Sequence, residues 1–323
     1  MTLSSFSPSS TRVRRSVAAV IVNWNTADLL EQCLQSLHDH GDAITEVVVV
    51  DNGSTDDSVA MVRERWPDSR LIANAENRGY QAANNQGMRV ATADYLLLIN
   101  ADAMLTPGCL TRLLERFDHD GAAAVVGPRL VYGDGRFQRW TAGRLPSLRS
   151  VGVYAFFIDR FFPRSGVWIG SDVHDAFQPG WVSSACMLVR RSSVEAIGLM
   201  DEQFFAYMDD VDLCARVREI GGHVWYEPAA TAVHLMGQSS MRQIGAASPL
   251  ALGAFVQWFA DRRGARAAQL MQAIVAAGFA LRAALYGAAG LVRPTWRSAA
   301  KGHARNVRLT LRPVDARAAK EAA

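Results

Sequence analysis

Cysteine is scarce in this sequence, and the few cysteines are far apart. The 323 residues contain 4 Cys, with no CxxC pair and no zinc-type spacing. This excludes a disulfide scaffold and a cysteine-based zinc site. We expect Cys33, Cys109, Cys186 and Cys214 to be buried free thiols of a reducing compartment.

Several common nucleotide-binding and catalytic motifs are also missing. The chain has no GxGxxG, no GxxxxGK[ST] and no GxSxG sequence. A Rossmann dinucleotide site, a P-loop and a hydrolase nucleophile elbow are therefore unsupported. With 50% hydrophobic residues and a net charge of +3, the chain is not generally disordered. Its chemistry must rest on carboxylates and lone histidines.

Charge is unevenly distributed along the chain. Residues 261–323 contain 12 Lys and Arg against 3 Asp and Glu, whereas residues 1–260 carry a net charge of −6. A basic segment on an acidic body predicts contact with an anionic surface, with a solvated tail as the alternative. Nucleic acid would explain none of the carboxylates described below, so we favour a membrane surface and expect no nucleic-acid partner.

Strands and helices alternate from the start of the chain. The apolar run at residues 17–22 is too short for a signal-peptide core and predicts a first strand instead. The alternation predicts an α/β fold whose parallel strands are joined by helices. The predicted strands are residues 16–22, 46–50, 70–72 and 95–99, and the predicted helices are residues 26–38, 57–65 and 80–91.

The second half of the chain continues this pattern and then changes. Residues 141–179 have weak periodicity and many aromatics, which indicates an insertion near an acceptor site. Beyond residue 247 the chain predicts Ala/Leu-rich helices at 250–259 and 267–292. Gln and Arg interrupt the second run, which favours an amphipathic helix on a membrane surface over a bilayer span. A helical cap or an oligomer contact is the alternative. The remaining predicted elements are a strand at 181–189, a helical turn at 194–197, a helix at 210–220 and a strand at 223–226.

Polar clusters follow three of the predicted strands. They are Asn23-Trp24-Asn25, residues 51–56 and Asn100-Ala101-Asp102. Ligands of open α/β sheets bind beyond the carboxyl ends of the strands, so these clusters predict a binding site. Helix capping explains some of these residues, although it does not require a polar cluster at every strand end.

Carboxylates and one histidine are the candidate chemical groups. Asp102 follows a buried strand, where a carboxylate suits Mg²⁺ or Mn²⁺, although a turn would also explain it. Asp209 and Asp210 open a helix, and their mutual repulsion predicts a raised pKa for one of them. His234 follows a strand-like stretch, where metal ligation and a structural role are both open.

The order of these motifs resembles the family 2 inverting glycosyltransferases of the GT-A fold, and within them the bacterial rhamnosyltransferase branch. The resemblance covers residues 16–242. The motifs are VNWN, VVVVDNGSTDDS, the N-x-G-Y-x-x-x-N-N pattern at 77–85, LLLINADAML, GWVSSACMLVRR, FFAYMDDVDLCARVREIGGHVWYEP and HLMGQSS. Gln138-Arg139-Trp140 is superficially similar to a motif of processive synthases. Its spacing is wrong and it precedes the base motif, so we treat it as coincidence.

The resemblance implies a role for each matching residue. Asp210 would be the catalytic base, preceded by Asp209 where the family usually has Glu. Asp102 would be the remaining acid of the D-x-D motif, with Asn100 in the first position, and His234 would complete the binding of Mg²⁺ or Mn²⁺. The implied nucleotide-sugar contacts are Asn23, Asn25, Asp51, Asn52, Gly53, Ser54, Asn77, Gly79, Asn84, Asn100 and Trp181, with Gly180 beside the last.

The resemblance implies an α/β, GT-A nucleotide-sugar-binding domain with a mixed central sheet and a C-terminal helical appendage. We divide the chain into a disordered tail (1–15), the glycosyltransferase domain (16–246) and C-terminal helices with a basic tail (247–323). The expected reaction moves L-rhamnose from dTDP-L-rhamnose to a saccharide or lipid-linked saccharide of a cell-surface polysaccharide. It would take place in the cytoplasm, at the inner face of the cytoplasmic membrane. The alternatives are a UDP- or GDP-sugar donor, a nucleotidyltransferase and a non-catalytic sugar-binding protein.

Overall fold

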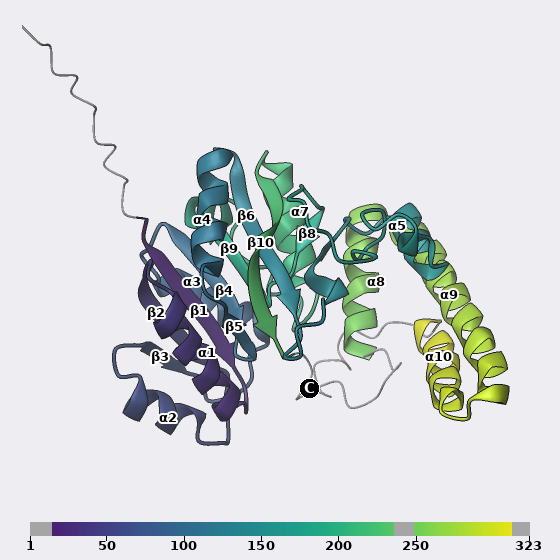
Figure 1. The fold of residues 1–323 in the computed structure, drawn as a ribbon, viewed down its shortest axis with the longest axis horizontal. Coiled ribbons are helices and arrows are strands. Elements are labelled where there is room, and N and C mark those ends of the chain that lie inside the picture. Colours follow the sequence, from purple (N-terminus) through teal and green to yellow (C-terminus); the bar gives the residue numbers. More distant parts are fainter. Residues whose placement is uncertain (1–14, 236–248, 312–323) are drawn as a thin grey trace, which may run out of the picture.

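The structure is a computed structural model that describes residues 15–235 and 249–311. It has a central sheet of eight strands, a small second sheet, and helices packed around them (Figure 1). The strands are β1 (Val17–Asn23), β2 (Ile44–Asp51), β3 (Arg70–Ala73), β4 (Tyr95–Asn100), β5 (Ala103–Leu105), β6 (Ala123–Val131), β7 (Ala142–Gly143), β8 (Trp181–Val182), β9 (Cys186–Arg190) and β10 (His223–His234). The helices are α1 (Ala27–His40), α2 (Ser58–Arg65), α3 (Tyr80–Val90), α4 (Cys109–His119), α5 (Leu148–Ala155), α6 (Arg191–Ala196), α7 (Asp209–Glu219), α8 (Pro249–Arg263), α9 (Ala265–Val292) and α10 (Trp296–Thr310), with 3-10 turns η1 (Arg139–Thr141) and η2 (Ile158–Arg160).

The central sheet is mixed, as expected. Its strand order is β3-β2-β1-β4-β9-β6-β10-β5. β1 is parallel to β2 and β4, whereas β9 is antiparallel to β4 and β6. The prediction of one strand over residues 181–189 is wrong, because β8 and β9 belong to different sheets. The chain leaves the first of them at Ser184, whose hydroxyl turns to the Asp209 carboxylate.

β4 shows how the sheet holds its polar strand ends in place. Leu96 and Leu98 face one apolar core, and Leu97 and Ile99 face a second core on the opposite side. All four are fully buried, and each such side chain contributes about 1.5–3 kcal/mol to stability. The cysteines are buried and free in the same two cores, as predicted. The carboxyl end of β4 is therefore fixed from both sides.

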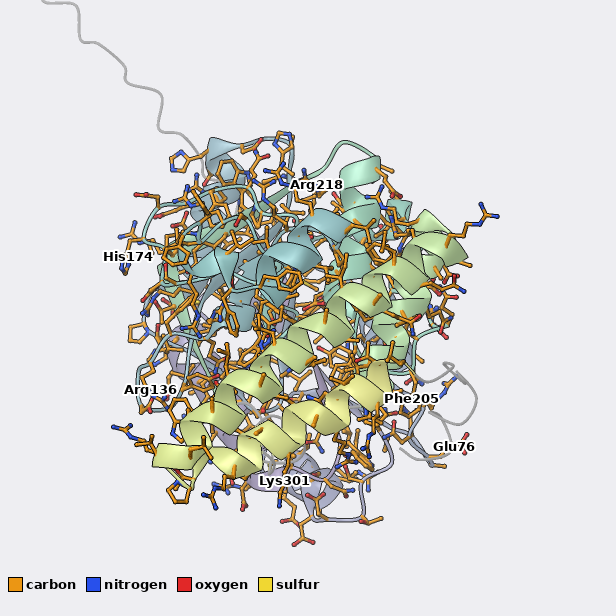
Figure 2. All side chains as sticks on the ribbon, turned by 90° about the vertical axis from the view of Figure 1, so that its right-hand side faces the viewer. Glu76, Arg136, His174, Phe205, Arg218 and Lys301 are labelled. Atoms are coloured by element: carbon orange, nitrogen blue, oxygen red, sulfur yellow. The ribbon has the colours of Figure 1, made fainter. Side chains whose placement is uncertain are left out.

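The C-terminal helices lie beside the sheet (Figure 1), and α9 and α10 run side by side across one face of the molecule (Figure 2). α9 packs on α5 of the insertion at Gly278. A Cβ atom added to Gly278 would lie 2.8 Å from the Cβ of Ala155. Arg282 donates hydrogen bonds to the carbonyl oxygens of Ala155 and Tyr154, at 2.7 and 2.9 Å. The two helices predicted in this region are confirmed.

Parts of three predicted features lie outside the described residues. They are the N-terminal tail up to residue 14, the HLMGQSS motif from Met236 onward, and the basic end of the chain from residue 312. The boundaries proposed at residues 15/16 and 246/247 remain predictions.

Candidate functional site

The polar strand ends meet at one edge of the central sheet. The parallel register pairs Asn23 of β1 with Asp51 of β2, and Val22 of β1 with Asn100 of β4. The three polar residues therefore end adjacent strands at the same level. We call this edge, formed by the ends of β1, β2 and β4 and the loops that follow them, the polar rim.

Asp51 shapes the loop that follows β2. Its Oδ1 accepts from the Ser54 amide at 2.9 Å, and its Oδ2 accepts from the Asn23 Nδ2 at 3.0 Å. The Ser54 hydroxyl accepts from the Asn25 amide at 2.9 Å and so joins the first two polar clusters. Asp51 is 2% exposed. It holds the rim together, and contact between its carboxylate and a nucleotide base remains a prediction.

Two glycines allow the rim loops to approach one another closely. Gly53 has φ +81°, and a Cβ atom there would lie 2.8 Å from the carbonyl carbon of Glu76. Gly79 has φ +88°, and its Cβ would lie 2.6 Å from the carbonyl oxygen of Phe205. Left-handed backbone and close contact together require glycine at both positions. Glu76 and Phe205 mark this part of the molecule in Figure 2.

Amide side chains connect the second cluster to the N-terminus of α3. The Asn52 Nδ2 donates to the Asn77 Oδ1 at 2.8 Å, and the same oxygen accepts from the Gly79 amide at 2.9 Å. The Asn84 Nδ2 donates to the Tyr80 carbonyl, one helical turn earlier, at 3.0 Å. Asn52 and Asn84 are buried, whereas Asn77 retains exposed surface that a ligand can contact.

Trp181 is buried inside the fold, in the apolar core that also contains Phe204 and Met208. Its side chain is 4% exposed, and its indole N–H donates to the Val167 carbonyl at 3.1 Å. A side chain so placed offers almost no surface to a sugar. Gly180 instead lines a separate cavity of about 340 Å³, which also includes Arg144, Arg164 and Arg218.

Tyr80 links the third cluster to the paired carboxylates. Its hydroxyl donates to the Asn100 Oδ1 at 2.8 Å. Burial raises the pKa of Tyr80, and the negative charges of Asp209 and Asp210 raise it further. Tyr80 therefore remains a neutral hydrogen-bond donor. The Tyr80 amide also donates to the Phe205 carbonyl at 2.7 Å, so the segment that leads into α7 lies beside the polar rim.

The paired carboxylates stand at the first turn of α7, where the helix dipole favours negative charge. Asp209 is buried and accepts a hydrogen bond from the Ser184 hydroxyl. Asp210 is partly exposed, and its Oδ1 accepts from the Val211 amide at 2.8 Å. Desolvation raises the pKa of Asp210 well above its usual range, and the charge of Asp209 raises it further. This confirms the expected raised pKa and suits a general base.

A segment with strained backbone immediately precedes these carboxylates. Tyr207 and Met208, immediately before Asp209, have φ +67° and +61°. Left-handed backbone costs a non-glycine residue about 1–3 kcal/mol and is concentrated at functional sites. The Gln81 Nε2 donates to the Tyr207 carbonyl at 2.9 Å and helps to hold this conformation.

Asp102 and His234 come together across the edge of the sheet. Antiparallel pairing of β5 with β10 places His234 opposite Ala103, next to Asp102. The His234 Nε2 lies 3.3 Å from the Asp102 Oδ1, and both side chains are mostly buried. On the other side of the ring, Nδ1 lies 3.0 Å from the Gln138 Oε1. The structure thus brings the two predicted metal ligands into contact.

This donor set fits Mg²⁺ or Mn²⁺ only with further oxygen ligands. Within residues 15–235 and 249–311, no cluster of three or more His, Cys, Asp or Glu could hold a metal. A carboxylate and an imidazole can hold such an ion when a substrate diphosphate supplies additional oxygens. The pair is therefore a candidate metal site that a bound diphosphate would complete.

Sequence reasoning missed three residues of the site. Gln138 was dismissed with its neighbours as coincidence, and Ser184 and Tyr80 were not singled out. Ser184 and Tyr80 do fall within motifs of the family resemblance, which offered a signal. Gln138 is 96 residues from His234, and no local pattern reveals their contact.

Comparisons with known proteins agree with this geometry. Residues 18–198 match the family model of Glycosyl transferase family 2. The chain is 31% identical over 239 residues to N-acetylglucosaminyl-diphospho-decaprenol L-rhamnosyltransferase of Mycobacterium tuberculosis. This alignment covers 69% of this chain and 77% of that protein. It is 27% identical over 231 residues to the succinoglycan biosynthesis protein ExoO of Rhizobium meliloti. That alignment covers 71% of this chain and 63% of the relative.

Among solved structures, the fold is similar to that of mannosyltransferase PcManGT from Pyrobaculum calidifontis, determined with GDP-Man and Mn²⁺. The TM-score is 0.59 over 91% of this chain and 85% of that one. At 20% identity, this likeness concerns the fold alone.

Proposed function

The chain belongs to glycosyl transferase family 2, and from this premise we propose that it transfers L-rhamnose from dTDP-L-rhamnose to a saccharide or lipid-linked saccharide acceptor. Its fold is that of the GT-A glycosyltransferases. The rhamnosyl donor is supported by the 31% identity with a rhamnosyltransferase, whose name also specifies a diphospho-linked lipid acceptor. A role in polysaccharide synthesis is supported by the likeness to the succinoglycan protein.

The observation that carries the proposal is the position of the paired carboxylates: the segment that leads into them is bonded to the start of α3 beside the polar rim, through the Tyr80 amide and the Gln81 side chain. The acceptor hydroxyl would give its proton to Asp210 while its oxygen attacks the anomeric carbon of the donor sugar. The bond from that carbon to the diphosphate oxygen breaks in the same displacement, so the configuration inverts. A bound Mg²⁺ or Mn²⁺, held by Asp102 and His234, would neutralise the charge of the leaving diphosphate. Asn77 and Ser54 would orient the nucleotide.

The first experiment is calorimetric titration of dTDP-rhamnose, UDP-sugars and GDP-sugars, each with and without Mn²⁺. We expect dTDP-rhamnose to bind most tightly and to depend on Mn²⁺. Preference for a UDP- or GDP-sugar would remove the rhamnosyl assignment and leave the reaction class. Failure of every donor to bind would contradict the proposal and favour a non-catalytic protein.

The Asp210→Asn variant, together with assays of the wild type, separates the remaining alternatives. The amide cannot accept the acceptor's proton, so we expect donor binding to persist while sugar transfer is lost. A non-catalytic sugar-binding protein would show no transfer in the wild type either. A nucleotidyltransferase would release pyrophosphate from a nucleoside triphosphate, which the wild type should not do.

We also propose that the enzyme docks on the inner face of the cytoplasmic membrane through α9. Within the described residues, α9 is the helix whose length and mean hydropathy, 1.6 over its most apolar window, would suffice to cross a bilayer. From residue 273 onward its exposed positions form an apolar stripe, which consists of Ala273, Ala277, Ala280, Leu281, Ala284, Leu285, Ala288, Leu291 and Val292. The contacts of Gly278 and Arg282 with α5 support a helix that lies along the membrane.

Charge beside this stripe supports an anionic membrane as the partner. α10 packs on α9, and Lys301 marks it in Figure 2. It exposes Arg297, Lys301, Arg305 and Arg308, and it contains no acidic residue. Apolar residues next to cations are typical of helices that lie at the interface of anionic lipids. The stripe could alternatively pair with a second copy of the chain, which is the outcome that a membrane test must separate.

A further inference from the structure

Gln138 is a buried glutamine outside every motif of the family resemblance, yet it contacts a predicted metal ligand. It lies between β6 and η1 and has no exposed surface. Its backbone amide donates to the Leu130 carbonyl at 3.0 Å, which fixes the residue to β6. Its side chain reaches across to β10 and contacts His234 twice, at the ring and at the backbone. A polar side chain so deeply buried and so fully engaged has a defined orientation.

The chemistry of the partners determines which way the Gln138 amide points. Its Nε2 donates to the His234 carbonyl oxygen, which can only accept. Its Oε1 must then be the atom that faces the His234 Nδ1, at 3.0 Å. Because Oε1 can only accept, Nδ1 must carry a hydrogen. The backbone carbonyl of His234 thus determines the orientation of the Gln138 amide, and this orientation determines that the His234 Nδ1 carries a hydrogen.

This tautomer decides what His234 presents to Asp102. A neutral imidazole with hydrogen on Nδ1 has a lone pair on Nε2, and Nε2 lies 3.3 Å from the Asp102 Oδ1. In this neutral form two acceptors face each other in a mostly buried place, so either a proton on Nε2 or a shared metal ion must lie between them. Backbone contacts hold the pair, since the Leu235 amide donates to the Asp102 carbonyl at 2.9 Å.

We propose that Gln138 is a positioning residue for the metal site: it holds His234 in the Nδ1–H tautomer and thereby aims the Nε2 lone pair at the ion shared with Asp102. Gln138 itself touches neither ion nor substrate. The inference rests on the proposed metal-dependent function and assigns the residue that prepares one of its ligands. Partners that orient a metal-binding histidine typically change metal affinity 10–100-fold when they are replaced.

The test compares Gln138→Leu with a matched control in the same hairpin. Thr141 is equally buried, and its hydroxyl accepts from the Leu130 amide and donates to the Pro128 carbonyl, at 3.0 and 2.9 Å. Thr141→Val therefore removes two buried hydrogen bonds nearby without touching His234. Mn²⁺ is titrated into each full-length variant, alone and with dTDP, and free Mn²⁺ is followed by electron paramagnetic resonance.

We expect Gln138→Leu to weaken Mn²⁺ binding roughly 10–100-fold, and Thr141→Val to stay within about threefold of the wild type. Gln138→Glu retains an acceptor for the Nδ1 hydrogen and should bind Mn²⁺ more tightly than Gln138→Leu. Equal affinity of Gln138→Leu and the wild type would overturn the inference, as would an equal loss in Thr141→Val.

Histidine nitrogen NMR tests the tautomer directly and without metal. The chain has 7 His, and the His234→Ala spectrum identifies the signals of interest. We expect the wild-type ring to carry its hydrogen on Nδ1 and the Gln138→Leu ring to lose this preference. A wild-type ring with hydrogen on Nε2 would overturn the inference. If Asp102→Ala and His234→Ala also leave Mn²⁺ affinity unchanged, the proposed metal site fails together with it. If those two weaken binding and Gln138→Leu does not, only the role of Gln138 fails.

Discussion

Asp210, the proposed base, stands beside a second carboxylate, whose charge affects the pH at which Asp210 can accept a proton. A protonated carboxyl cannot accept a proton, so transfer falls as the pH drops through the pKa of Asp210. Burial and the charge of Asp209 raise that pKa. The fall therefore begins at a higher pH than an ordinary Asp, with a pKa of about 3.9, would give.

Replacing Asp209 by Asn tests this coupling. The substitution removes the neighbouring negative charge, so the pKa of Asp210 should fall and the acid limb of kcat/KM should move to lower pH. The measurement is kcat/KM against pH for the wild type and Asp209→Asn, with Asp210→Asn as the inactive reference. An acid limb that stays in place would mean that Asp210 is not the titrating base.

At the scale of elements, local pattern predicted well where burial is simple. The strand at 95–99 was predicted because every residue of YLLLI is buried on one face or the other. The helices at 250–259 and 267–292 were predicted because both segments are rich in Ala and Leu. The break between β8 and β9 was not predicted, although Ser183 and Ser184 interrupt the apolar run there. α10 was missed because its buried face, which includes Asn306, is polar.

The candidate site likewise contains residues that the sequence could predict and residues that it could not. Strand-end residues such as Asn23 and Asp51 were predictable because parallel strands end at one edge. Trp181 was expected to contact a ligand, yet its aromatic side chain is part of the core. Gln138 could not be found, because its significance arises only when β10 brings His234 to it.

The contact between α5 and α9 yields a prediction that compares one substitution at two glycines. Gly278→Ala would place a methyl group 2.8 Å from the Ala155 Cβ, which forces the helices apart. Gly287→Ala, in the same helix, meets nothing within 4 Å. Overpacking costs about 1–3 kcal/mol, whereas Ala in an open helical position gains about 1 kcal/mol over Gly. The free energy of unfolding in urea should therefore fall in Gly278→Ala and rise in Gly287→Ala. Equal changes in the two variants would contradict the close contact between α5 and α9.

For the whole molecule, the apolar stripe of α9 predicts how the enzyme meets a membrane. Leu281 and Leu285 are 37% and 53% exposed. Replacing both by Lys should weaken binding to phosphatidylglycerol vesicles at least about tenfold, because each Leu contributes up to about 1.5–3 kcal/mol when fully buried. The same residues replaced by Ala should lose less. Vesicle sedimentation gives the affinity. Unchanged binding, or a dimer in the wild type that the Lys variant dissociates, would contradict membrane docking.

The packing of α5 on α9 also bears on how this protein can be recombined. Ala155 of the insertion and Arg282 of α9 are 127 residues apart in the chain, yet a hydrogen bond joins them, and Gly278 packs on the same alanine. A chimera cut at residue 247 would combine an α5 and an α9 that had never been matched. Designers who wish to exchange either segment should therefore graft both together, and natural substitutions in one should be accompanied by changes in the other.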